Sequence, residues 1–167
     1  MMVRIAVLAV ASAALVSDLR SGRIGNWLSA AGLTAAVLCH LAEPATFWLC
    51  PAGAAVPLLL GWPLFRLHMI GAGDVKLLMA LGALTGAADF WPFLAVVLVF
   101  GGVLSLVLML AFSGVKGRLL YFSSWVSRGL RTGKWAPYRT GGTERTENFH
   151  FTVPVLMAAV CYAGGMF

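Results

Sequence analysis

The sequence predicts an all-α membrane protein with six transmembrane helices, both chain termini outside, and a cytoplasmic amphipathic helix between the fifth and sixth spans. Three observations support this fold class. Of the 167 residues, 60% are hydrophobic and only 11% are charged, which is more apolar surface than one water-soluble core can bury. The apolar residues fall into six long runs, and most Lys and Arg residues gather in alternate loops. We expect residues 1–167 to form a single membrane domain.

The six apolar runs define the expected spans. Several runs are shorter than the roughly 20 residues that a perpendicular span prefers, so their ends should include flanking polar residues or meet a locally thinner bilayer. The runs cover residues 3–16, 27–42, 47–65, 75–88, 91–112 and 149–164.

The distribution of positive charge predicts the orientation. Arg20 and Arg23 follow the first run, Arg66 and Lys76 flank the turn before the fourth, and the loop before the sixth is rich in Lys and Arg. Because basic loops stay in the cytoplasm, both termini are expected outside, and only Arg4 opposes this arrangement. The basic excess therefore indicates membrane topology, and we expect no nucleic acid partner.

The first run has a second interpretation, as a secretory signal peptide. Arg4 would form its charged start, and residues 11–13, Ala-Ser-Ala, would form a cleavage site. The other five runs need no cleavable signal to insert, so we expect the first run to be a span.

The loop of residues 113–148 is the one long polar region. Its first half places apolar residues at helical spacing with basic and hydroxyl residues on the other faces, which is typical of a helix on an anionic membrane surface. A helix packed against the bundle fits the same pattern. The second half, residues 132–148, is rich in turn residues and is expected to be a connector. The spaced apolar residues are Val115, Leu119, Phe122, Val126 and Leu130.

The cysteines Cys39, Cys50 and Cys161 have no CxxC spacing, so neither a zinc site nor a disulfide framework is indicated. They are expected to act as small apolar residues. A Cys39–Cys50 disulfide across the loop between the second and third spans is the alternative, if that loop faces an oxidising compartment.

Two acidic residues, Asp18 and Asp74, lie where expected spans meet the cytoplasmic face. Acidic residues so close to hydrocarbon are costly and are usually functional when they face the bundle interior. Each also has a structural explanation, because Asp74 could cap the fourth helix and Asp18 could be a solvated residue balanced by nearby arginines.

The glycines before Asp74 favour a functional role. Gly71 and Gly73 let the backbone bend and another segment approach closely, which a helix cap does not require. Two carboxylates at one membrane edge suit the aspartic protease mechanism, in which one activates water and its protonated partner polarises the scissile carbonyl. Such chemistry uses water as the nucleophile and needs no cofactor or metal.

Two segments carry a resemblance to a known family. "GAGDVKLLMALG", residues 71–82, resembles the GxGD segment of the type IV prepilin peptidases, and "SDLRSGRIGNW", residues 17–27, resembles their first aspartate motif. "HFTVPVLMAAV", residues 150–160, is similar in position to the last helix of that family. Asp18 and Asp74 match the catalytic aspartates, and Gly71, Gly73, Lys76 and Asn26 match supporting motif positions.

The resemblance implies an endopeptidase of the bacterial inner membrane. Such an enzyme cuts prepilins and pseudopilins after a glycine at the cytoplasmic boundary, among membrane lipids and in contact with pilus-assembly machinery. Gly25 replaces the usual proline, so the turn there should be looser. The N-terminal methyltransferase region is lacking, so the chain resembles the short branch that processes Flp-type prepilins of tight-adherence pili, and N-methylation is not implied.

Several side chains have expected roles in this interpretation. Because a helix N-terminus favours negative charge and a C-terminus disfavours it, Asp74 is hypothesised to be ionised and Asp18 protonated. Lys76 should extend to the lipid headgroups, and Asn26 should hold the turn after Asp18 or cap the second helix. His40 is expected to be a buried or interfacial hydrogen-bonding residue. His150 has no evident acidic partner.

Small residues on the fourth and fifth spans predict close helix packing. Gly82, Ala83 and Gly86 form one such surface, and Gly101 and Gly102 belong to another. A further hypothesis places a groove for a substrate helix on these surfaces.

Two other functions fit the same residues. One is another intramembrane aspartyl protease, such as a preflagellin peptidase or a presenilin-like enzyme. The other is a non-enzymatic pilus-assembly component or small transporter, whose aspartates bind ions or partners.

Overall fold

The computed structural model describes residues 1–41, 47–67, 70–111, 115–133, 135 and 150–166, and all regular secondary structure in this part of the chain is α-helical. The all-α prediction is therefore confirmed. Helices lie at the positions of all the expected spans and of the expected amphipathic segment. They are α1 (Met2–Ser21), α2 (Asn26–Leu41), α3 (Leu49–Arg66), α4 (Ala72–Ala111), α5 (Val115–Thr132) and α6 (Thr152–Ala163).

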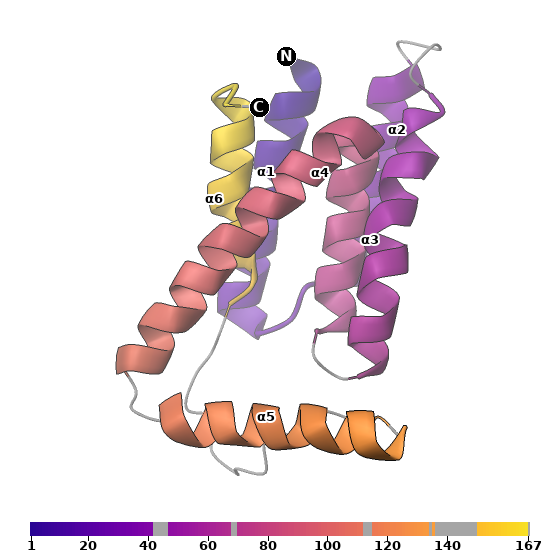
Figure 1. The fold of residues 1–167 in the computed structure, drawn as a ribbon. Helices are drawn as coiled ribbons and strands as arrows, with labels where there is room; N and C mark the ends of the chain where they lie inside the picture. The colour runs from indigo at the N-terminus through magenta and orange to yellow at the C-terminus, as the bar shows by residue number, and fades with distance from the viewer. Residues whose placement is uncertain (42–46, 68–69, 112–114, 134, 136–149, 167) are drawn as a thin grey trace.

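Helix α4 contains two of the expected spans, joined by a sharp bend at Gly86. Gly86 has φ 77° and ψ 162°, a conformation that glycine adopts far more readily than other residues. A straight helix over Ala72–Leu108 would extend about 55 Å, well beyond the roughly 30 Å of a bilayer's hydrocarbon. Figure 1 shows the chain passing along the bundle before the bend and returning after it.

Three helices are long and apolar enough to cross a membrane: Met2–Ser21, Leu49–Arg66 and Ala72–Leu108. The helices Asn26–Leu41 and Thr152–Ala163 are apolar but shorter. Large apolar side chains on α4, among them Leu98 and Leu106, are exposed on the outside of the bundle, as lipid contact requires. The chain is therefore a multi-pass membrane protein, whereas the count of six spans and the outside location of the termini stay predictions.

Both chain termini lie at the same end of the bundle, and α5 lies across the other end (Figure 1). We call the first the terminal end, defined by Arg4, His40, Asp89 and Tyr162. There the Arg4 guanidinium lies 5.9 Å from the centre of the Tyr162 ring, and the Tyr162 hydroxyl donates to Asp89 at 3.3 Å. Arg4, which opposes the expected charge distribution, thus has an aromatic partner inside the protein.

Glycines bring α3 and the first half of α4 into close contact. A Cβ atom placed on Gly53 would lie 1.9 Å from the carbonyl oxygen of Gly82, and one on Gly82 would lie 2.3 Å from that of Gly53. Ala83 is also fully buried. Helix α3 therefore fills the surface around Gly82, and the hypothesis of a substrate groove there is wrong.

The second half of α4 is less closely packed at its glycines. A Cβ on Gly101 would lie 3.8 Å from Pro154, and one on Gly102 would meet no atom within 4 Å. These glycines do not mark a tight helix contact.

His40 and the cysteines have structural roles. His40 is buried, and its Nε2 lies 3.1 Å from the Ala83 carbonyl oxygen, which confirms the expected hydrogen-bonding role. All three cysteines are free thiols, so Cys39 and Cys50 do not form a disulfide in this structure.

Candidate active site

Asp18 lies in the last turn of α1, just before the hydrogen-bonded loop that connects α1 to α2. Gly22 ends the helix with φ 62°, and its N–H donates to the Asp18 carbonyl at 2.7 Å. The hydroxyls of Ser17 and Ser21 both donate to the Arg23 carbonyl, at 3.2 and 2.9 Å. These bonds hold the turn that Gly25 was expected to loosen.

Asp74 is the third residue of α4, so it lies in the first turn of the helix. The backbone N–H of Gly71 donates to its carboxylate, and the Val75 N–H donates to the Gly71 carbonyl at 3.3 Å. The expected capping role is therefore present. It does not exclude a catalytic role, because a carboxylate can accept further hydrogen bonds.

Each of the two glycines in the Gly-Ala-Gly-Asp segment is needed for a different steric reason. A Cβ on Gly71 would lie 3.0 Å from Oδ2 of Asp74, and one on Gly73 would lie 3.2 Å from the Cβ of Ile24. Gly71 thus leaves room for the carboxylate, and Gly73 leaves room for the turn between α1 and α2. The motif brings the region after Asp18 against the helix that carries Asp74.

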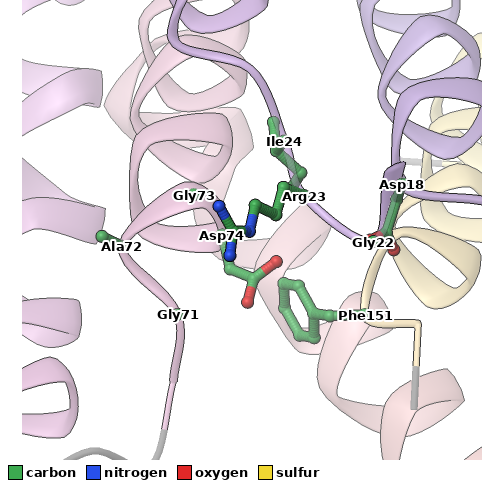
Figure 2. A pocket seen from close by; sticks show the side chains of 9 residues that line it. All are labelled: Asp18, Gly22, Arg23, Ile24, Gly71, Ala72, Gly73, Asp74 and Phe151. Carbon is green, nitrogen blue, oxygen red and sulfur yellow. The ribbon is translucent and has the colours of Figure 1, made fainter. Parts of the chain in front are cut away.

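Both aspartates line one cavity of about 390 Å³ at the end of the bundle opposite the termini. We call this the cavity end. Figure 2 shows the Phe151 ring within the cavity, between the two aspartates in this view, and the Arg23 side chain extending over Asp74. No direct hydrogen bond joins the two carboxylates within the described part of the chain. The cavity is lined by Asp18, Gly22, Arg23, Ile24, Gly71, Ala72, Gly73, Asp74 and Phe151.

The first residue of α6 and a histidine two positions before it supply two hydrogen-bonding groups to Asp18. The Thr152 hydroxyl donates to Oδ2 of Asp18 at 2.7 Å, and Nδ1 of His150 lies 3.0 Å from the same oxygen. The expectation that His150 has no acidic partner was therefore wrong. It failed because the two residues are 132 positions apart, and only the packing of α1 against α6 brings them together.

The supporting residues Asn26 and Lys76 contact each other. Asn26 is the first residue of α2, and its side-chain oxygen accepts a hydrogen bond from Nζ of Lys76 at 2.8 Å. The Lys76 ammonium is thus held by a neighbouring helix, in contrast to the expected extension to the headgroups. This bond links the starts of α2 and α4 beside the cavity.

The sequence analysis assigned no site role to four residues at this site, which are Arg23, His150, Phe151 and Thr152. Arg23 was read only as a loop charge, and Phe151 was not considered. The sequence does contain a signal for the α6 residues, because His150, Phe151 and Thr152 begin the segment that resembles the last helix of the family. That resemblance was too loose to assign individual roles.

The cavity contains chemistry suited to water activation. It presents two carboxylates, one of which accepts side-chain hydrogen bonds, and its described lining residues include no Ser, Cys or Lys that could attack a substrate. Among the described residues there is no cluster of three or more potential metal ligands. One carboxylate can act as a base and the other, when protonated, as an acid.

Comparison with known proteins identifies the family. Residues 5–125, more than half of the chain, match the model of the type IV leader peptidase family. No curated protein and no solved structure shows significant similarity to the chain. The matched region contains both aspartates and the glycines before Asp74. The chain therefore belongs to the type IV leader peptidase family.

Proposed function

We propose that this membrane peptidase is an aspartyl endopeptidase in which Asp18 and Asp74 together activate a water molecule. The observation that carries the proposal is that two carboxylates from helices far apart in the sequence line one cavity. In this mechanism the ionised aspartate takes a proton from water while the protonated one polarises the scissile carbonyl. The water then attacks the carbonyl carbon, and the peptide C–N bond breaks after the leaving amine is protonated.

The proposed substrates are Flp-type prepilins and pseudopilins, cut after the glycine that precedes their hydrophobic helix. Two features support this choice. The family acts on prepilins, and the cavity lies at the end of the bundle, where a cut at the border of a substrate's membrane helix would occur. A cut deep within a transmembrane helix, as in presenilin-like enzymes, would need a site nearer the middle of the bundle.

The proposed location is the bacterial inner membrane, with the cavity on the cytoplasmic side. Arg20 lies in the last turn of α1 and Arg66 in the last turn of α3, and both helices end at the cavity end (Figure 1). Arg23 lines the cavity itself. Because basic loops are retained in the cytoplasm, this end should face the cytosol.

Co-expression with a Flp-type prepilin tests the proposal. Mass spectrometry of the pilin should show a shortened chain, cut after the glycine, with the intact enzyme. Asp18→Asn and Asp74→Asn should each leave the precursor at full length while the enzyme accumulates normally in the membrane. If either variant still produces the shortened pilin, the two-aspartate mechanism is wrong. If both do, the aspartates would instead fit a role in pilus assembly or transport.

A further inference from the structure

We propose that Thr152, the first residue of α6, and His150, two positions before it, are positioning residues that hold Asp18 as the ionised, water-activating member of the pair. Asp74 is then the protonated partner. This inference rests on the proposed function and reverses the roles expected from the sequence. It also assigns a task to α6, which lies outside the residues 5–125 that match the family.

The contacts on Asp18 favour its ionised form. The hydroxyl of Thr152 donates to Oδ2 of Asp18 at 2.7 Å, which is the usual O–H···O hydrogen-bond distance. Thr152 is fully buried, and the Asp18 side chain is only 14% exposed. With its Nδ1 protonated, His150 donates a second hydrogen bond to the same oxygen. Donors directed at a carboxylate stabilise its negative charge.

The helix dipoles do not favour the ionised form of one aspartate over that of the other. The sequence argument placed Asp18 at the unfavourable C-terminal end of its own helix, but Asp18 also contacts the first residue of α6. The N-terminal end of a helix carries partial positive charge, so α6 offsets the effect of α1. Asp74 lies in the first turn of α4. Both carboxylates thus face a helix N-terminus. The side-chain donors on Asp18 are therefore what favours Asp18 as the ionised member of the pair.

The arrangement also fixes the orientation of the carboxylate. Both donors use Oδ2 of Asp18, and in the described part of the chain no hydrogen bond occupies Oδ1. With one oxygen anchored to α6, the other remains available to a water molecule in the cavity. Asp74 has a backbone donor from Gly71 and no comparable pair of side-chain donors among the described residues.

Two substitutions of Thr152 test this role. Thr152→Val keeps the shape but removes the hydroxyl, and it should lower kcat by at least about 10-fold with KM nearly unchanged, because only the position and charge of Asp18 are disturbed. Thr152→Ser restores the hydroxyl and should recover most of the lost kcat. The control is Thr85→Val, because Thr85 is also buried but donates to carbonyls of its own helix. Wild-type kcat in Thr152→Val overturns the inference.

Substitutions of His150 provide a second test if Thr152→Val fails to accumulate in the membrane. His150→Asn keeps a donor near the position of Nδ1 and should retain more activity than His150→Leu, which removes it. Equal activity in the two variants overturns the role of His150.

Infrared difference spectra test which aspartate carries the proton. Asp18→Asn should remove a carboxylate band, and Asp74→Asn should remove a carboxylic acid band. The opposite result overturns the assignment, although prepilin cleavage could still depend on both aspartates. If cleavage instead survives Asp18→Asn, the proposed function itself fails, so the two failures are distinguishable.

Discussion

Each end of the bundle contains an aspartate that accepts a hydrogen bond from α6, but the two surroundings differ. At the cavity end, Thr152 donates to Asp18. At the terminal end, Tyr162 donates to Asp89. Each end also has a cavity of similar size, about 390 Å³ at the cavity end and about 330 Å³ at the terminal end. Neither an acidic side chain nor an open space therefore distinguishes the candidate active site.

The cavity end differs from the terminal end in having a second carboxylate and a glycine-containing backbone that leaves room for it. Only the cavity end combines two aspartates, because Gly71 and Gly73 let α4 begin beside the turn that follows Asp18. Among the residues that the structure describes, Asp89 is the one carboxylate of the terminal cavity, where it lies with aliphatic, aromatic, thiol and imidazole groups. A pair of carboxylates can divide the roles of base and acid, and a single carboxylate cannot fill both at once.

Removing one carboxylate at each end should give the largest contrast. Asp18→Asn and Asp74→Asn should each lower the rate of prepilin cleavage by at least about 100-fold, since a positioned acid or base contributes roughly 10² to 10⁴ in rate. Asp89→Asn should stay within about threefold of wild type. Cleavage rates of purified enzyme in lipid vesicles measure this. A loss at Asp89 as large as at Asp18 would remove the distinction between the ends.

The contact that positions the Asp74 half of α4 should respond strongly to added volume. Gly53→Ala would place a methyl group against the Gly82 carbonyl, and forced overpacking should lower the free energy of unfolding by about 1–3 kcal/mol. The control is Gly102→Ala, where the new methyl meets open space and alanine's helix propensity should stabilise by up to about 1 kcal/mol. Unfolding titrations in mixed detergent compare the two. Equal stability of both variants would contradict the close α3–α4 contact.

A smaller effect is expected from crowding Asp74 directly. Gly71→Ala would bring a Cβ to 3.0 Å from Oδ2 of Asp74. The carboxylate must then shift, and a displacement well under 1 Å should lower kcat by about 10-fold without unfolding the protein. Gly117→Ala on α5, which meets no atom within 4 Å, is the matched control. Unchanged kcat in Gly71→Ala would mean that the orientation of Asp74 is not critical.

The smallest effect should come from the bond between Lys76 and Asn26. Lys76→Met and Asn26→Ala should each lower stability by about 0.5–1.5 kcal/mol, the usual net value of one hydrogen bond. The double variant should cost less than the sum, because both changes remove the same contact. A double-mutant cycle on unfolding free energies measures this coupling. Strict additivity would show that the 2.8 Å contact contributes nothing.

Much of the fold and part of the site could be predicted from local patterns. The apolar runs indicated the helices because a bilayer demands long hydrophobic segments, and the amphipathic period indicated α5. Asp18 and Asp74 stood out because carboxylates are costly beside hydrocarbon. Gly71 and Gly73 stood out because glycine before an aspartate permits close approach.

The partners of those residues could not be predicted in the same way. Gly82 was expected to border a substrate groove, but small residues only permit close approach and do not specify which helix approaches. In the structure α3 occupies that surface through Gly53. Lys76 was expected at the headgroups because its length allows it, but the side-chain oxygen of Asn26 lies near enough to accept a hydrogen bond from its ammonium group.

The sequence by itself determined the helical membrane fold, the approximate ends of its helices and the two aspartates, because these depend on hydrophobicity, charge and backbone freedom within short segments. Only the tertiary structure decided which groups surround each carboxylate. Thr152 and His150 meet Asp18 because α1 and α6 pack together across more than 130 residues of chain. Hydrogen bonds of that kind depend on which residues are close in space, and this proximity cannot be predicted from a local sequence pattern.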